Sequence, residues 1–148
     1  ILYSGTVSAA NLGTMKGIPS IAYSLDTIRN GDFTASKPIT QKVAKKVLEN
    51  GMPKGTLLNV NIPNCDKNDI QGFRVTKQGT EFWEDLLESR DDPRGRKYLW
   101  MTGKRINEDD ALDLDGFAIA NNFVSLTPIH YKLTNESFLP ELDTWDLK

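Results

Sequence analysis

The sequence has little cysteine, little histidine and little net charge. It has one cysteine and one histidine in 148 residues, and 18 basic residues against 20 acidic ones give a formal net charge of −2. A single cysteine excludes an internal disulfide and fits a reducing compartment, so we expect a cytoplasmic protein. Without a basic excess there is no electrostatic basis for binding nucleic acid, and a small substrate or a protein partner is favoured.

Long apolar runs are also lacking. No run approaches the roughly 20 residues that span a bilayer, so we expect no membrane partner. The first residues, Ile1 to Gly5, lack the basic and apolar regions of a signal peptide. Because the chain begins without an initiator methionine, we expect it to start inside a longer protein. The hydrophobic content of 39% and charged content of 26% are typical of a globular domain.

The first half alternates between helical and strand patterns, which is typical of a parallel α/β sheet. Gly17 is placed to end the first helix in the left-handed conformation, and Asn50-Gly51 to end the second. The predicted elements are a helix over 6–16, a strand over 18–25, a helix from Pro38 with apolar residues at Ile39, Val43, Val47 and Leu48, and a strand over 56–63.

The second half changes character, because the segment from Gln78 to Gly103 is charged and carries several aromatic residues. A turn signal at 91–95 predicts a long hairpin that projects from the domain. The predicted elements are a strand over 72–76, hairpin arms Thr80 to Leu87 and Arg96 to Met101, a short helix over 113–121, a strand over 123–128, and a polar tail with Leu139, Leu142 and Trp145 as docking residues. The chain divides into a core over 1–77, a projecting hairpin over 78–103, a return to the core over 104–128 and a tail over 129–148.

The first candidate for chemistry is Ser4-Gly5-Thr6 at the start of the first helix. Free backbone N–H groups, the positive end of the helix dipole and two hydroxyls can point at one phosphate there. Taken alone, the same three residues also make an ordinary helix cap.

Five ordered blocks of sequence resemble the SurE family of metal-dependent nucleotide phosphatases. They cover nearly all of the chain as far as Pro128. The blocks are residues 3–25, with YSGTV, AA, GIPSIA and SL; 58–63, LNVNIP; 75–79, VTKQG; 92–100, DPRG followed by Tyr98 and Trp100; and 115–128, with Asp115, Ala118 and VSLTP.

The resemblance implies a Rossmann-like α/β core with a parallel or mixed sheet, helices on both faces, a projecting hairpin and a C-terminal tail. It also implies a divalent metal, Mg²⁺ or Mn²⁺, and hydrolysis of nucleoside 5′-monophosphates by a homodimer or homotetramer. The family's metal ligands belong to a segment that precedes Ile1, so only Ser4, Gly5 and Thr6 carry over, as phosphate-binding residues. No catalytic residue and no metal ligand of this chain is implied.

Other polar residues favour structural roles over catalysis. The acidic cluster of Asp109, Asp110, Asp113 and Asp115 lacks the glycine and the terminal glutamate of a calcium loop, and we interpret it as a solvated loop with possible helix-capping duty. Asp91-Asp92 is interpreted as part of a turn rather than as an acid pair.

The remaining reactive and aromatic side chains are also interpreted structurally. His130 is the only histidine, but it follows a strand end where exposed histidines are common. Cys65 lies in a polar loop without a nearby histidine, so nucleophilic use is disfavoured. Trp83, Tyr98 and Trp100 suit packing in the hairpin better than base stacking, and the family resemblance implies subunit contacts there.

Three positions depart from the family pattern. Leu12 stands where glutamate is usual, Asn122 where glycine is usual, and Lys132-Leu133-Thr134 where Asp-Leu-Thr is common. Asparagine tolerates positive φ, so the second departure is mild.

Two alternatives to a phosphatase stay open from the sequence: a non-catalytic phosphate- or nucleotide-binding module, and a portion that serves oligomerisation. We further expect the isolated chain to lack activity without the metal segment. We also expect marginal stability, because a parallel sheet without its first strands has an unpaired edge.

Overall fold

A computed structural model describes the chain apart from residues 2, 81, 107–110 and 148, and apart from the side chains of residues 82, 83, 85, 104 and 105. Asp109, Asp110 and the Trp83 side chain therefore lie outside the described residues. The element order is α1 (Gly5–Met15), β1 (Ser20–Asp26), α2 (Ser36–Asn50), β2 (Thr56–Pro63), the 3-10 turn η1 (Lys67–Asp69), β3 (Gly72–Val75), β4 (Phe82–Asp91), β5 (Lys97–Ile106), α3 (Asp115–Ala120), β6 (Phe123–His130) and α4 (Leu139–Leu142).

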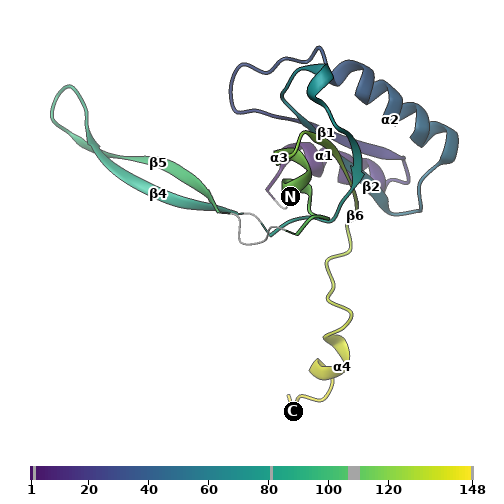
Figure 1. Cartoon of the computed structure of the whole chain (residues 1–148). Coiled ribbons are helices and arrows are strands. Elements are labelled where there is room, and N and C mark those ends of the chain that lie inside the picture. The colour runs from purple at the N-terminus through teal and green to yellow at the C-terminus, as the bar shows by residue number, and fades with distance from the viewer. Residues whose placement is uncertain (2, 81, 107–110, 148) are drawn as a thin grey trace.

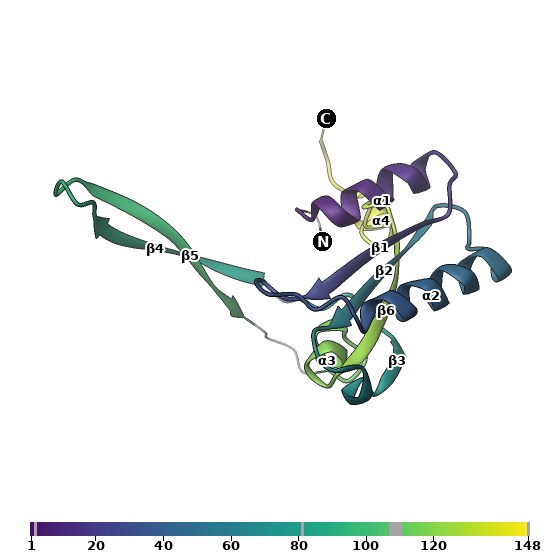
Figure 2. The same cartoon turned by 90° about the horizontal axis from the view of Figure 1, so that it is seen from above.

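The core is a four-stranded mixed sheet in the order β1-β2-β6-β3, with helices on both faces (Figures 1 and 2). β1 and β2 are parallel and connected through α2, as the alternating pattern of the first half predicts. β6 runs antiparallel to β2 and parallel to β3, so it enters between two strands that precede it in the chain. The mixed sheet agrees with the predicted fold class, whereas the purely parallel pattern of the first half does not extend to β6.

Alternate residues of the strands face different helices. On one face, Val7 and Ala10 of α1 pack with Ala22 and Leu57. On the other face, Ile39 and Val43 of α2 pack against a cluster that includes Val60, Ile62 and Val124. This two-sided burial explains the nearly continuous apolar character of β2, since a strand covered on both faces has no solvent side.

The predicted end of the first helix at Gly17 is confirmed, whereas the predicted start of the second helix needs a correction. α1 ends as predicted: Gly17 has φ +79°, and its N–H and that of Ile18 donate to Thr14 and Gly13 carbonyls at 2.9 and 3.0 Å. α2 begins at Ser36 rather than at Pro38. Pro38 is tolerated in the first turn because an N–H at this position would have no intrahelical partner. Leu48 is 85% exposed and not part of the core. It lies nine residues after Ile39, which places it on the opposite side of a helix with 3.6 residues per turn.

The hairpin β4–β5 projects from the body, and the tail leaves the sheet at the end of β6 (Figure 1). The hairpin pairs over ten residues on each arm, from Phe82 opposite Ile106 to Asp91 opposite Lys97, which is longer than predicted. In the tail, the rings of Phe138 and Trp145 meet edge to face at 5.9 Å. Leu139, Leu142 and Trp145 are 48, 37 and 52% exposed, so these predicted docking residues lack the burial that docking on the body would bring.

Candidate phosphate site and adjoining cleft

Ser4 is the N-cap of α1, and its side chain is already engaged. Its backbone is extended, with φ −78° and ψ 116°, and its Oγ accepts from the Val7 N–H at 3.3 Å. Its own N–H donates to the Ile1 carbonyl at 2.9 Å. Ser4 therefore forms the ordinary helix cap that the sequence predicts as the alternative to a phosphate site. Its hydroxyl hydrogen remains able to donate to an anion.

Gly5 begins the helix at a position where the described chain does not require glycine. Its φ is not positive, and a Cβ added there would meet nothing within 4 Å. Neither backbone strain nor packing therefore explains the missing side chain. Close approach of a ligand to the backbone is a separate reason for glycine at such a position.

Thr6 is exposed at the second helical position. The first four N–H groups of a helix lack intrahelical acceptors, so the turn of Ser4, Gly5 and Thr6 combines orphan donors with hydroxyl groups at the positive end of an 11-residue helix. This arrangement can bind an anion.

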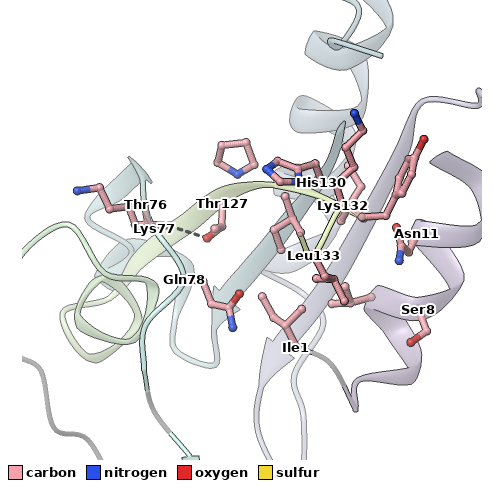
Figure 3. A pocket seen from close by; sticks show the side chains of 15 residues that line it. Ile1, Ser8, Asn11, Thr76, Lys77, Gln78, Thr127, His130, Lys132 and Leu133 are labelled. Atoms are coloured by element: carbon pink, nitrogen blue, oxygen red, sulfur yellow. Dashed lines mark hydrogen bonds between the residues drawn. The ribbon is translucent and has the colours of Figure 1, made fainter. Parts of the chain in front are cut away.

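A cleft of about 460 Å³ adjoins this turn (Figure 3). Its walls come from α1, from the end of β6 and the residues that follow, and from the segment after β3. The lining residues are Ile1, Val7, Ser8, Asn11, Leu57, Thr76, Lys77, Gln78, Thr127, Pro128, Ile129, His130, Tyr131, Lys132 and Leu133. Ser4, Gly5 and Thr6 lie just outside this lining, between Ile1 and Val7.

Three buried hydroxyls lie at one wall of the cleft, where Thr76 and Thr127 belong to the lining and Ser125 does not. Thr76 Oγ1 lies 2.8 Å from Ser125 Oγ and 2.8 Å from Thr127 Oγ1, and the last two lie 3.3 Å apart. All three residues are at most 4% exposed. This cluster was not predicted from the sequence. The available signal was Ser125 and Thr127 two apart in an otherwise apolar strand, which places both hydroxyls on one face.

The acidic residues that the structure describes support the structural interpretation. Asp113 Oδ2 forms an exposed ion pair with Lys77 Nζ at 2.6 Å, and this hydrogen bond lowers the pKa of Asp113 and raises that of Lys77. Asp115 Oδ1 accepts from the N–H groups of Gly79 and Gly116, both at 2.9 Å. Asp115 therefore ties the start of α3 to the segment that leads into the hairpin.

The other reactive candidates are not assembled into a catalytic group. His130 ends β6, is exposed, and lines the cleft. Burial raises the pKa of the Cys65 thiol, and the nearby carboxylates of Asp69 and Asp66 raise it further. A raised pKa keeps the thiol protonated and disfavours its use as a nucleophile. In the hairpin, Trp100 is 51% exposed with the Arg90 guanidinium 5.1 Å from its ring centre.

The described residues do not fit a divalent metal site. Within the part of the chain that the structure describes, no group of three histidine, cysteine, aspartate or glutamate side chains is placed to hold a metal. Mg²⁺ prefers carboxylate oxygens and water, whereas the turn at Ser4–Thr6 offers mostly donors. The turn is therefore suited to an anion and not to a cation. Among the described helices, none has the length and apolar character needed to cross a membrane.

The fold and the helix-start turn define a mixed-sheet α/β protein with an anion-binding geometry. The sequence model of the family described as Survival protein SurE matches residues 1–85 of this chain. The chain belongs to the SurE family.

Similar proteins support the same assignment. A protein named 5′-nucleotidase SurE from Chlorobium luteolum is 44% identical over 147 residues, and one of the same name from Christiangramia forsetii is 40% identical over 148. Each alignment covers 99% of this chain and 57% of the relative. The crystal structure of the SurE protein from Aquifex aeolicus matches with a TM-score of 0.80 at 37% identity, over 96% of this chain and 57% of that one. The chain therefore spans a little over half the length of the relatives it matches.

Proposed function

We propose that this chain forms the phosphate-binding side of a metal-dependent phosphatase that hydrolyses nucleoside 5′-monophosphates to nucleoside and phosphate. The observation that carries the proposal is Gly5, a glycine that neither φ nor packing requires, beside the hydroxyls of Ser4 and Thr6 at a helix start. Family membership and the name 5′-nucleotidase carried by the relatives support the choice of substrate.

In this proposal the phosphate lies on Ser4, Gly5 and Thr6. Their N–H and O–H groups neutralise the phosphoryl oxygens and orient the group, and such preorganised donors are more effective in a transition state than mobile water. The cofactor, Mg²⁺ or Mn²⁺, is proposed to be held by the N-terminal segment of the family, which the alignments to this chain do not cover. When bound, a divalent ion supplies a nucleophilic water and polarises the phosphoryl group. The isolated chain is accordingly proposed to bind phosphate without cleaving its ester.

The test is phosphate release from nucleoside 5′-monophosphates with added Mn²⁺ or Mg²⁺. It is run on this chain and on a chimera that places the preceding segment of the Chlorobium luteolum relative before Ile1. We expect activity only in the chimera, abolished by a chelator. Release by the short chain at a rate equal to that of the chimera would place the metal ligands here, and the acidic residues Asp109 to Asp115 would be substituted first.

We also propose that the protein is cytoplasmic and assembles as a homodimer or homotetramer through the hairpin and tail. The support for assembly is the exposure of large apolar side chains on both, such as Leu99, Met101 and Leu147 at 65, 70 and 79%.

The activity test also addresses the alternative function. A chain that binds nucleotide but shows no turnover even with the preceding segment would favour the non-catalytic binding module instead.

A further inference from the structure

The chain contains two Asn-Gly dipeptides in different structural settings. They are residues 30–31, in the connection between β1 and α2, and residues 50–51, at the end of α2. In an Asn-Gly pair the backbone nitrogen of the glycine can attack the side-chain carbonyl carbon of the asparagine, because glycine has no side chain to hinder the approach. Asparagine is one of the thermolabile residues for this reason. Asn30 and Asn50 are both exposed, so exposure alone does not distinguish them.

The reacting groups of the first pair are not held by hydrogen bonds. Within the part of the chain that the structure describes, neither the side-chain amide of Asn30 nor the N–H of Gly31 has a hydrogen-bond partner. The next residue is held, since the Asp32 N–H donates to Asn64 Oδ1 at 3.1 Å. The connection between β1 and α2 runs at the periphery of the body (Figure 1), where solvent reaches the pair.

The local backbone explains why both residues of this pair are present. Asn30 has φ +56°, in the left-handed region that asparagine tolerates better than most residues. Gly31 is required by packing, because a Cβ there would lie 3.0 Å from Leu25 Cδ2 and 3.1 Å from Thr27 Cγ2. The turn therefore selects a dipeptide that is chemically labile.

The second pair is held at both reacting groups. Asn50 Nδ2 donates to the Lys46 carbonyl at 2.8 Å, and the Gly51 N–H donates to the Val47 carbonyl at 2.9 Å. Both hydrogen bonds belong to the last turn of α2, which ends at Asn50. They must break before the nitrogen of Gly51 can reach the side chain of Asn50.

We infer that Asn30 is a site of spontaneous deamidation. The Gly31 nitrogen gives its proton to hydroxide and forms a bond to Asn30 Cγ. The Cγ–Nδ2 bond then breaks, and the leaving nitrogen takes a proton from water and departs as ammonia. Water opens the resulting succinimide at either of its carbonyls, which gives aspartate or isoaspartate. The net reaction consumes water and releases ammonia, and it does not depend on the proposed function.

The modification changes both the charge and the backbone of the turn. Each conversion adds one negative charge to a chain whose formal net charge is −2. In isoaspartate the main chain runs through the former side chain and is longer by a methylene group. Gly31 lies so close to Leu25 and Thr27 that even a Cβ would require a shift, so the longer backbone must displace this part of the loop.

The experiment compares the two pairs within one molecule. The 148-residue chain is kept at mildly alkaline pH, either folded or unfolded in urea, and circular dichroism verifies the folded state. Digestion with pepsin at acid pH, followed by mass spectrometry, measures the loss of the amide at each asparagine. In the folded chain we expect Asn30 to react at least about tenfold faster than Asn50, because two hydrogen bonds protect Asn50. In urea we expect similar rates at the two sites.

Two variants assign the more acidic product that ion-exchange chromatography separates. Asn30→Gly removes the amide and keeps a residue that adopts positive φ, so the acidic product should no longer form at its early rate. Asn50→Gly, the matched control, should form it as fast as the unmodified chain. The inference is overturned if Asn50 reacts as fast as Asn30 in the folded chain, or if Asn30→Gly still yields the acidic product at the unmodified rate.

Discussion

At the scale of single residues, the most informative position is Gly5, because its conformation and packing leave the choice of glycine unexplained. An added Cβ meets nothing within 4 Å, whereas at Gly13 it would come within 2.4 Å of Ser20 Oγ. Gly13 is thus a packing glycine and Gly5 is not.

Gly5→Ala should separate stability from binding. Alanine is the better helix former, so we expect the free energy of unfolding to stay the same or rise by up to about 1 kcal/mol. The methyl group obstructs approach to the backbone donors, and the affinity for inorganic phosphate should fall about tenfold, which corresponds to the loss of one hydrogen bond to a charged group. Urea denaturation and phosphate titration measure the two effects. Unchanged phosphate affinity would argue against the phosphate turn.

Cys65 provides a prediction about pH. Burial and the carboxylates of Asp69 and Asp66 disfavour the thiolate, so the pKa of the thiol lies above its ordinary value. The thiolate is the reactive form, and alkylation by iodoacetamide should reach half its maximal rate at a higher pH in the folded chain than in the same chain unfolded in urea. Asp66→Asn combined with Asp69→Asn should move the folded midpoint downward. Coincident folded and unfolded profiles would show that the thiol is not shielded.

At the scale of elements, α2 shows which apolar positions of a periodic pattern matter. Ile39 is 9% exposed within the core cluster and Leu48 is 85% exposed on the opposite side. Ile39→Ala should lower the free energy of unfolding by about 2–5 kcal/mol through lost burial and a residual cavity. Leu48→Ala, the matched control, should change it by no more than about 0.5 kcal/mol. Denaturant melts of both variants provide the comparison, and equal losses would contradict the orientation of α2.

The hairpin carries an apolar face that is open to a partner. Leu87 is paired with Met101 and Ser89 with Leu99, so Leu87, Leu99 and Met101 share one face. They are 60, 65 and 70% exposed. We propose this face as the part of the hairpin that contacts another copy of the chain, because exposed apolar patches of this kind are typical of interaction surfaces.

Replacing these three residues by serine should reduce the size of the assembly measured by analytical ultracentrifugation. The control replaces Gln41, Lys45 and Lys46 of α2 by alanine and should leave the size unchanged. A serine variant with the sedimentation of the unmodified chain would remove the hairpin from the proposed interface.

At the scale of the whole molecule, the exposed area is large for the mass. The chain exposes 11164 Å² at 16.6 kDa, whereas a compact monomer of that mass exposes about 7,600 Å². The hairpin and the tail extend away from the body and account for the excess exposed area (Figure 1). In addition, β1 pairs with β2 alone among the strands that the structure describes, so its other edge lies at the margin of the sheet.

We therefore expect the isolated 148-residue chain to be marginally stable or prone to aggregation, because an unpaired strand edge and exposed apolar surface both favour association. Light scattering during a thermal melt should show growth in particle size before or with unfolding. A sharp, cooperative melt from a monodisperse sample would contradict this prediction.

Local sequence determined the helices, most strands and the candidate phosphate turn, because capping, turn chemistry and apolar periodicity act over a few residues. The end of α1 at Gly17, the positive φ of 58° at Asn122 and the N-cap at Ser4 were all predictable in this way. The family resemblance was likewise carried by short ordered blocks.

Only the tertiary structure decided how distant segments meet. The insertion of β6 between β2 and β3 depends on pairing between strands that are far apart in the sequence. The apolar pattern of one strand does not indicate which strand it pairs with or in which direction it runs. The cleft joins α1 to Thr76 and Thr127, and the pairing of β3 with β6 brings these two hydroxyls together. Leu48, by contrast, could have been excluded from the core by the sequence alone, because a spacing of nine residues from Ile39 places it on the opposite side of the helix.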